Sequence, residues 1–251
     1  MNDTTRSFLD YHRNARTFSL DAPPSVDEWP DEWVTVNFKG YPRFSRIPLP
    51  PARFSSALPV HEVMRARHTT RSFDSDTPLT VEELSRIMVG LELTAGFGES
   101  APSSRRAYAS AGGRYPIEAY VLPLKIENLS SHVFHYHVRS HSLEELWPFS
   151  REQFVNCSPH AEGLGDSAAA IVLTACHGRT SMKYGDRAYQ FCLLEAGEIA
   201  QNIQLLCAAE RFACCSFGGG NDEAIMRLLD IAPSEELVMH VMFVGKPTLT
   251  P

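Results

Sequence analysis

Two neighbouring side chains, Lys183 and Tyr184, could together carry a proton to or from a substrate. They stand directly before a long apolar segment, and the pKa of each can be shifted by burial and by the charge of the other. Such tunable groups are what general acid–base catalysis requires. A lysine beside a tyrosine is more often a solvated cation next to an interfacial ring, so the pair gains weight only from the motifs around it.

A second cluster offers positive charge. Arg67, Thr69 and Arg71 place two guanidinium groups and one hydroxyl within five residues. Arginine forks match the oxygens of a phosphate group, so this spacing suits a phosphate ligand, although such clusters also occur at solvated helix ends. Two glycine-containing stretches, 110–114 and 218–220, supply backbone that can approach a flat ligand closely or simply turn the chain.

The elements that position these residues can be predicted from their spacing. Thr80 and Glu83 form a capping box, and the helix that follows has apolar residues at helical intervals. A further helix ends near Arg67, a loop rich in Gly, Ser and Pro covers 96–106, and a short helix covers 222–229. Strands are expected at 119–124, 133–138, 168–175, 212–217 and 236–244.

This mixture of elements indicates an α+β fold. Strands and helices do not alternate as in βαβ units, and no Gly-x-Gly-x-x-Gly fingerprint is present. The longest predicted helix, 188–211, is apolar on most sides, with Glu195 and Glu198 inserted. A helix that is apolar nearly all round is buried, and we expect this one to lie at a subunit interface.

Two histidines lie in one predicted strand. His135 and His137 would share a face of the strand at 133–138, because side chains alternate along a strand. Two histidines could bind a metal ion, but no acid or cysteine falls at ligand spacing. We therefore expect surface histidines and no metal site.

Residues 1–59 differ in composition from residues 60–251. Eight prolines interrupt the first stretch and forbid long helices, whereas its aromatic residues argue against disorder. We predict an N-terminal arm, residues 1–59, that wraps the domain formed by residues 60–251 or a sister subunit. A docking segment for a partner protein is the alternative.

Composition limits the classes of protein. The 251 residues are 43% hydrophobic and 21% charged, as in soluble globular proteins. A formal net charge of −7 argues against nucleic acid and anionic membranes as partners. Six cysteines without a Cys-x-x-Cys pair indicate buried free thiols in a reducing compartment. With neither a signal-peptide pattern nor a membrane span, a cytoplasmic protein is expected.

Several motifs together resemble a known family. Residues 67–74, Arg-His-Thr-Thr-Arg-Ser-Phe-Asp, are similar to the segment that opens flavin-dependent nitroreductases. The stretches 110–116 and 183–189, with Leu-Glu-Ala-Gly and Ala-Gln-Asn after them, resemble a narrower branch, the SagB-type dehydrogenases. These oxidise thiazolines and oxazolines in modified peptides to azoles. The resemblance covers residues 56–248 and implies a nitroreductase-like fold, with helices flanking a mixed or antiparallel sheet, and a homodimer with flavin at its interface.

Carried over by position, the resemblance implies a site for flavin mononucleotide (FMN). The residues placed on its phosphate and ribityl chain are Arg67, His68, Thr69 and Arg71. Those bordering its pyrimidine side are Ser110, Gly112, Gly113 and Arg114, and those facing its N5 edge are Gly218 and Gly219. Lys246 would add a charge to the phosphate or remain a surface lysine. Glu198 stands where relatives often carry histidine, which leaves the substrate open.

The resemblance further implies an FMN-dependent dehydrogenase that converts an azoline to an azole in natural-product biosynthesis. Lys183 and Tyr184 are the expected catalytic residues, one as the base and the other as its activator. The alternatives are an NAD(P)H-dependent nitro or quinone reductase of the same fold and a non-catalytic partner of a cyclodehydratase. Expected partners are a second copy of the chain and a small-molecule or peptide substrate, and a cyclodehydratase complex is left open.

Overall fold

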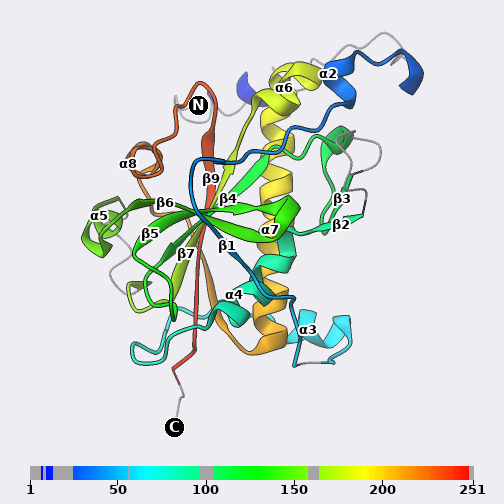
Figure 1. The fold of residues 1–251 in the computed structure, drawn as a ribbon. Coiled ribbons are helices and arrows are strands. Elements are labelled where there is room, and N and C mark those ends of the chain that lie inside the picture. The colour runs from blue at the N-terminus through cyan, green and yellow to red at the C-terminus, as the bar shows by residue number, and fades with distance from the viewer. Residues whose placement is uncertain are drawn as a thin grey trace.

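In the part of the chain that the structure describes, nine strands are arranged in two sheets. The structure is a computed structural model that describes residues 7, 10–13, 25–55, 57–95, 104–157 and 164–248. The strands are β1 (Arg46–Pro48), β2 (Leu93–Ala95), β3 (Arg105–Arg106), β4 (Ile117–Pro123), β5 (His132–His137), β6 (Ser142–Pro148), β7 (Ala169–Ala175), β8 (Ala213–Phe217) and β9 (Leu237–Gly245). Seven strands form one sheet in the order β1-β6-β5-β4-β7-β9-β8, with antiparallel neighbours throughout (Figure 1). Strands β2 and β3 pair separately.

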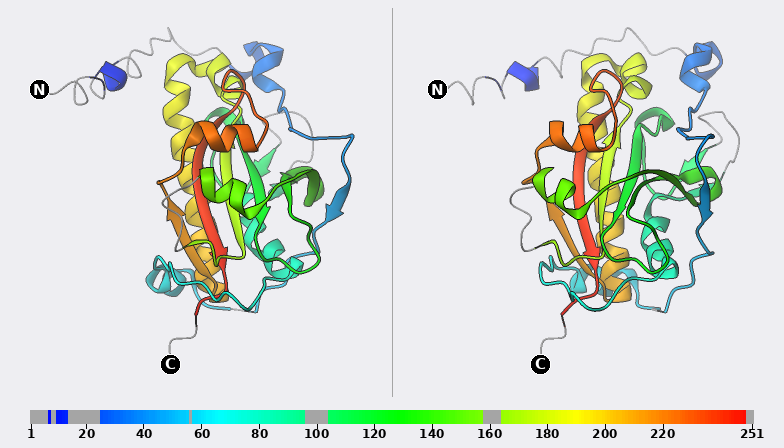
Figure 2. Two further views of the ribbon diagram at one scale, coloured as in Figure 1. Left: turned by 90° about the vertical axis from the view of Figure 1, so that its left-hand side faces the viewer. Right: turned by 60° about the vertical axis from the view of Figure 1, so that its left-hand side comes forward.

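Helices cover both faces of the large sheet. The α-helices are α2 (Asp31–Val34), α3 (Val60–Ala66), α4 (Val81–Met88), α5 (Arg151–Cys157), α6 (Gly178–Tyr184), α7 (Ala188–Glu210) and α8 (Asp222–Leu228). The 3₁₀ turns are η1 (Val26–Glu28), η2 (Val89–Leu91), η3 (Ala111–Gly113), η4 (Val138–Ser140) and η6 (Gly185–Arg187). Helix α7 packs on one face with α4 beside it, and α5 and α8 cover the other face (Figure 2). The predicted α+β fold is confirmed.

Strand β7 is buried on both of its faces. All seven of its residues are inaccessible to solvent. Because alternate side chains point to opposite faces, Ile171 and Leu173 join the core beneath α7, whereas Val172 joins the core beneath α5 and α8. The apolar run predicted as a buried strand at 168–175 is therefore a central strand covered by helices on either side.

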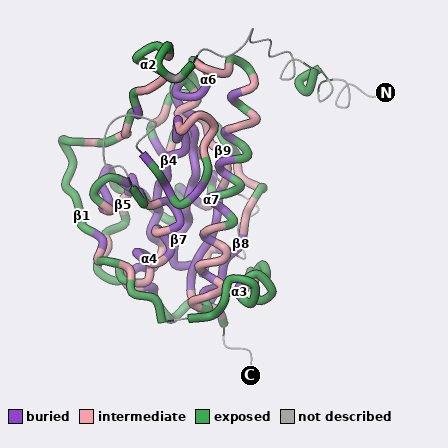
Figure 3. The backbone as a smooth tube through the Cα atoms, turned by 90° about the vertical axis from the view of Figure 1, so that its right-hand side faces the viewer, coloured by how far each residue is buried: buried purple, intermediate pink, exposed green. Residues whose placement is uncertain are grey.

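Helix α7 is buried by this chain on its inner face alone. Cys192 and Ile199 lie against the sheet with no exposed surface. On the outer face Tyr189, Leu193 and Leu194 are 41, 44 and 63% exposed, and Figure 3 shows accessible turns along this helix. The prediction of a helix apolar on most sides holds, but part of that apolar surface faces outward.

Most of the other predicted elements are present. The capping box is confirmed, because the Glu83 backbone N–H donates to Thr80 Oγ1 at 3.2 Å and the Thr80 backbone N–H donates to the Glu83 carboxylate at 3.0 Å. The five predicted strands correspond to β4, β5, β7, β8 and β9, with ends displaced by one or two residues. Most of the predicted loop at 96–106 lies outside the described residues. Strand β6 was not predicted, since its two glutamates hide the apolar pattern.

The prediction of surface histidines is wrong for His135, which is completely buried. Its Nδ1 lies 2.8 Å from Glu144 and its Nε2 lies 3.0 Å from Glu118. Burial by itself lowers the pKa of His135, but these two carboxylates outweigh it and raise the pKa. Arg46 pairs with Glu144 at 2.7 Å and Arg179 with Glu118 at 2.6 Å. A carboxylate at each ring nitrogen favours the protonated imidazole within this buried ion-pair network. The carboxylates come from other strands, where strand periodicity cannot reveal them.

The described part of the N-terminal arm, residues 7, 10–13, 25–55 and 57–59, contributes one strand to the large sheet. Strand β1 is an edge strand paired with β6. Lys39 forms an ion pair with the buried Glu236. These contacts fix the arm on the domain that follows it, while the division of the chain at residue 59 stays a prediction.

The cysteines are structural in character. All six are free, and five of them are buried, as predicted. Burial raises the pKa of Cys192 to about 12, so its thiol stays protonated and unreactive at neutral pH. Among the described helices, none is both long and apolar enough to cross a membrane.

Candidate functional site

Lys183 and Tyr184 occupy the last turn of α6 and meet the η3 turn. A Cβ atom on Gly112 would lie 2.6 Å from the Tyr184 hydroxyl oxygen and 3.3 Å from Lys183 Nζ. Gly112 also has a φ of +62°, which glycine adopts without strain. The turn therefore brings bare backbone against both proton-carrying groups and joins two motifs that are distant in sequence.

Burial and one buried cation shift the charge states of this pair. Burial is the main cause that lowers the pKa of Lys183, and the positive charge of Arg114 lowers it further. Burial raises the pKa of Tyr184, and Arg114 offsets part of that rise. The first shift moves the lysine toward the range in which an amine acts as a base, whereas the second opposes formation of a phenolate.

Arg114 connects three segments around the pair. It is 1% exposed, its Nε donates to the carbonyl oxygen of Arg179 at 2.9 Å, and its Nη1 donates to the carbonyl oxygen of Trp33 at 2.6 Å. The guanidinium group thus ties the end of η3 to α6 and to the arm. Its Nη2 donates to Met182 Sδ at 3.5 Å, so all three guanidinium nitrogens have partners within the chain, and the expected contact with flavin stays a prediction.

Two glutamates of α7 hold the segment that leads into η3. Glu198 accepts a hydrogen bond from the Ala109 backbone N–H at 3.0 Å. Burial raises the pKa of Glu195 to about 8 despite a hydrogen bond with Ser110, so this carboxyl group is mostly protonated at neutral pH. Ser110 Oγ in turn accepts the Tyr115 backbone N–H at 2.8 Å. The sequence analysis assigned no role at the site to Glu195. The sequence feature that could have indicated one is the presence of a glutamate within an otherwise apolar helix.

The predicted phosphate residues lie toward the other end of α7. Arg67 Nη1 donates to Gln204 Oε1 at 3.4 Å, and Arg71 hydrogen-bonds to the Cys215 thiol. His68 lines a cavity of about 540 Å³ in this region, and the neighbouring Thr69 is exposed. Arg67 thus reaches α7 and Arg71 reaches β8, with His68 beside the cavity between them, and their binding of a phosphate group stays a prediction.

The last three predicted flavin ligands follow strands β8 and β9. Gly218 and Gly219 come directly after β8, and a Cβ on Gly218 would meet no atom within 4 Å. Lys246 comes directly after β9, where its ammonium group pairs with Glu83 and lies 5.1 Å from the centre of the Phe212 ring. Gly218 thus leaves open space, whereas Lys246 is already engaged with a carboxylate.

Helix α7 separates the two groups of site residues within one chain. Tyr184 packs its ring 5.0 Å from the ring of Phe191, and Arg67 reaches Gln204. Phe191 and Gln204 are 13 residues apart in α7, which corresponds to about 20 Å along the helix. Figure 1 shows α6 and α3 at opposite ends of α7. The structure does not bring the Lys183–Tyr184 pair and the Arg67–Arg71 cluster together.

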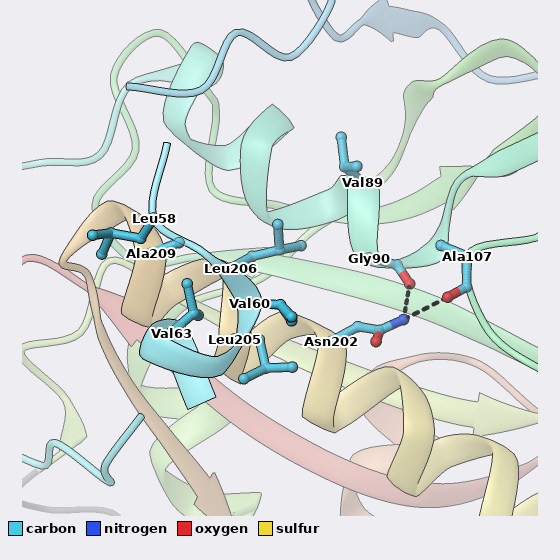
Figure 4. Close-up of a pocket in the computed structure, with 10 residues that line it drawn as sticks. All are labelled: Leu58, Val60, Val63, Val89, Gly90, Ala107, Asn202, Leu205, Leu206 and Ala209. Carbon is cyan, nitrogen blue, oxygen red and sulfur yellow. Dashed lines mark hydrogen bonds between the residues drawn. The ribbon is translucent and has the colours of Figure 1, made fainter. Parts of the chain in front are cut away.

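An apolar surface connects the two ends. A groove of about 380 Å³ lies between α3 and α7, lined by Leu58, Val60, Leu205 and other apolar side chains (Figure 4). At its rim Asn202 Nδ2 donates to the carbonyl oxygens of Gly90 and Ala107, at 3.2 and 2.9 Å. Asn202 also borders a second hollow, of about 510 Å³, under the exposed Leu193 and Leu194. This surface follows the outer face of α7.

The candidate residues form two groups, and each group fits a different part of FMN. The Arg67–Arg71 cluster has the donor chemistry for a phosphate group, beside a cavity. The η3 turn is a cradle that a Cβ would fill, so it can approach a flat ring system. A single chain keeps the two groups apart, and a complete site requires that both lie beside one ligand.

Comparison with known sequences finds a matching family model and two similar proteins. Residues 64–246 match the sequence model of the Nitroreductase family. The protein MJ1384 of Methanocaldococcus jannaschii, named as a nitroreductase, is 26% identical over 194 residues, which cover 73% of this chain and 90% of that protein. The Microcin B17-processing protein McbC of Escherichia coli is 25% identical over 203 residues, which cover 76% of this chain and 73% of McbC.

Solved structures share the fold. A nitroreductase from Anabaena variabilis superposes with a TM-score of 0.73 at 18% identity over 95% of this chain, which spans 46% of that longer chain. The Escherichia coli microcin synthetase McbBCD complex contains a chain that matches with a TM-score of 0.62 at 21% identity, covering 98% of this chain and 94% of that one. A nitroreductase from Exiguobacterium sibiricum in complex with FMN matches at 0.55, with 11% identity over 78% of this chain and 91% of that chain.

Proposed function

This chain belongs to the nitroreductase family, and on that basis we propose that it is an FMN-dependent dehydrogenase that oxidises an azoline ring to the azole. The substrate would be a thiazoline or oxazoline in a peptide or a related natural product. The observation that carries the proposal is the position of Gly112, where an added Cβ atom would lie 2.6 Å from the Tyr184 oxygen and 3.3 Å from Lys183 Nζ. The similarity to the microcin-processing protein McbC over 76% of the chain supports it.

Aromatisation of an azoline removes one proton from the ring α-carbon and one hydride from the neighbouring carbon. FMN, when bound, would supply the redox chemistry by taking up the hydride with its two electrons, and dioxygen or another acceptor would be the final oxidant. The protein must therefore accept the proton. Lys183 and Tyr184 are the groups that do so, because both lie against the same backbone turn and their pKa values are shifted by burial.

The predicted cofactor residues divide the binding of FMN between the two ends of α7. Arg67, His68, Thr69 and Arg71 would hold the phosphate and ribityl chain. Ser110, Gly112, Gly113 and Arg114 would border the pyrimidine side of the flavin, and Gly218 and Gly219 would face its N5 edge. Lys246 would contribute only by leaving Glu83, with which it is paired.

Pairing of two chains would complete the site. If a second copy packs in the antiparallel sense along the outer face of α7, the Arg67–Arg71 cluster of one chain meets the Lys183–Tyr184 pair of the other. The exposed Leu193 and Leu194 support this arrangement, because exposed apolar side chains that lie side by side commonly mark protein–protein contacts. The groove beside α3 would be buried in the same interface.

The test compares flavin-loaded variants. Lys183→Ala and Tyr184→Phe should retain bound flavin and lose azoline oxidation by about 10²–10⁴-fold, which is what general acid–base catalysis contributes. Mass spectrometry measures the loss of two hydrogens from candidate azolines. Lys125→Ala is the control, because Lys125 follows the end of β4 that is opposite to η3 and binds the Asp74 carbonyl oxygen, away from the Lys183–Tyr184 pair. Unchanged oxidation by both variants would place the base elsewhere.

A second candidate function is the NAD(P)H-dependent reduction of nitro compounds or quinones. The match to a protein named as a nitroreductase, over 90% of its length, favours it. Stopped-flow mixing with NADPH distinguishes the two functions. Fast reduction of the bound flavin that is insensitive to Lys183→Ala would support the reductase. Slow reduction, together with azoline oxidation, would support the dehydrogenase. The match to a chain of the McbBCD complex supports a cyclodehydratase partner, which co-purification can test.

A further inference from the structure

Two tryptophans of the N-terminal arm lie on the Lys183 side chain. Lys183 Nζ is 3.3 Å from the centre of the Trp29 ring and 5.1 Å from that of Trp33. The two indoles contact each other edge to face, with centroids 6.4 Å apart. An ammonium group within about 6 Å of an aromatic ring is attracted by it, and tryptophan is the strongest partner. The Trp29 contact therefore favours the charged form of Lys183.

The arm is fixed at this place by a second contact. The buried Arg114 donates from Nη1 to the Trp33 carbonyl oxygen at 2.6 Å and from Nε to the Arg179 carbonyl oxygen at 2.9 Å. One guanidinium group thereby locks α2 of the arm onto α6, which carries Lys183. The indoles are consequently part of the wall of the site and do not depend on the lysine alone for their position.

The groups around Lys183 have opposing effects on the stability of its ammonium form. Arg114, at the end of η3, repels the ammonium, and burial also disfavours it. Tyr184, the next residue of α6, has its ring centre 5.6 Å from Lys183 Nζ. The indoles from the arm oppose the first two effects. Two cations, Lys183 and Arg114, thus stand beside one phenol.

We propose that Trp29 and Trp33 are positioning residues that hold Lys183 as an ammonium ion beside Tyr184, and that the Tyr184 oxygen takes the substrate proton. This inference rests on the proposed azoline oxidation. In that step the C–H bond at the ring α-carbon breaks, and its proton forms an O–H bond with the Tyr184 phenolate. The electron pair stays on the ring, from which a hydride leaves with the cofactor.

The geometry explains why both cations are needed. Burial raises the pKa of Tyr184, so a phenolate forms only where positive charge is close to the oxygen. The Tyr184 oxygen and Lys183 Nζ lie against the same point of the η3 turn, at 2.6 and 3.3 Å from a Cβ placed on Gly112. A lysine held by indole faces keeps its charge while it activates the phenol. A lysine that acted as the base would have to be deprotonated, and the indole rings disfavour deprotonation because they stabilise the ammonium form.

The first experiment measures Lys183 directly, without any substrate. The chain has four lysines, Lys39, Lys125, Lys183 and Lys246, so selective ¹³C labelling of the lysine ε-carbons yields a spectrum of four signals. Lys183→Arg removes one signal and assigns it. We expect the Lys183 ε-protons to be shifted upfield by the ring current of Trp29. Trp29→Leu should abolish that shift and lower the Lys183 pKa by about 0.5–1.5 units.

Matched variants test whether the change in the titration is specific to Trp29. Trp33→Leu should produce a smaller change than Trp29→Leu, in keeping with its longer distance. Trp147→Phe replaces the third tryptophan, whose indole binds the Leu228 carbonyl oxygen on α8, and should leave the Lys183 signal unchanged. A Lys183 signal at the ordinary position that Trp29→Leu does not move would overturn the proposal.

The second experiment separates the roles of the two residues. Arginine keeps the positive charge and cannot act as a base at neutral pH. We therefore expect flavin-loaded Lys183→Arg to oxidise azoline at least about tenfold faster than Lys183→Ala. Trp29→Leu should lower turnover and move the rising limb of the pH–rate profile to higher pH, because the phenolate loses part of its stabilisation.

Other outcomes count against the proposal in distinct ways. Equal inactivity of Lys183→Arg and Lys183→Ala would make Lys183 the base. Faster turnover in Trp29→Leu would mean that the indole blocks the site. If the wild-type protein oxidises no azoline, the proposed function fails, and with it the role of Tyr184. The lysine titration would still report whether the arm holds Lys183.

Discussion

Replacing Gly112 with alanine tests the contact on which the proposed site depends. The new Cβ would lie 2.6 Å from the Tyr184 oxygen, whereas ordinary contact begins at 3.4 Å, so the groups must separate by about 0.8 Å. Alanine at a φ of +62° also adds about 1–2 kcal/mol of backbone strain. Misplacing a catalytic group by about 1 Å can cost about 10²-fold in rate. We therefore expect azoline oxidation to fall by about 10- to 100-fold.

The assay follows the initial rate of loss of two hydrogens by mass spectrometry, with flavin content from absorbance and stability from thermal unfolding. Gly185→Ala is the control, because Gly185 also has a positive φ, of +53°, but a Cβ there would meet no atom within 4 Å. It should lower stability and retain most of the turnover. Wild-type turnover in flavin-loaded Gly112→Ala would refute the reasoning. Equal losses of turnover in the two variants would assign the effect to strain and not to the contact.

Three further predictions concern protonation, cofactor and assembly. Burial raises the pKa of Glu195 to about 8 in the folded state, against an ordinary value of 4.5. Between these two values the folded state binds more protons than the unfolded state, so the free energy of unfolding falls as pH rises from about 4.5 to about 8. The unfolding free energy of the wild type relative to Glu195→Gln should therefore fall by several kcal/mol between about pH 5 and pH 9, as denaturant titration can measure. Arg67→Ala combined with Arg71→Ala should release FMN from a folded protein, since each charge-assisted contact contributes about 1.5–3 kcal/mol. Leu194→Glu should convert a dimer to monomers in light scattering, because it places a charge in the proposed interface.

The first two of these predictions have matched control variants. Glu223→Gln, at an exposed glutamate of α8, should leave the pH dependence of stability unchanged. Arg65→Ala, at an exposed arginine of α3, should retain the flavin. A pH-independent stability difference for Glu195→Gln would mean that the buried carboxyl group is ionised. Full flavin occupancy in the double arginine variant would move the phosphate site elsewhere. A flavin-loaded monomer at low concentration would rule out assembly of the site from two chains.

Local patterns predicted the elements of this fold well. The Thr80–Glu83 capping box depends on residues three apart, and the apolar run of β7 is contiguous in the chain. The family motifs are equally local, which is why short stretches of sequence were enough to indicate the nitroreductase resemblance. Local patterns could not predict strand β6 or the burial of His135. Their charged residues are satisfied by partners on other strands, and local composition makes them look exposed.

The sequence alone therefore determined the family, the order of most elements and the identity of the residues that could do chemistry. The tertiary structure decided how those residues meet. It placed Gly112 against Tyr184, laid Trp29 on Lys183, and set the Arg67–Arg71 cluster at the far end of α7. The physical reason is that spacing and side-chain chemistry are encoded within a few residues. Contacts between distant segments depend instead on how the whole sheet and its helices pack.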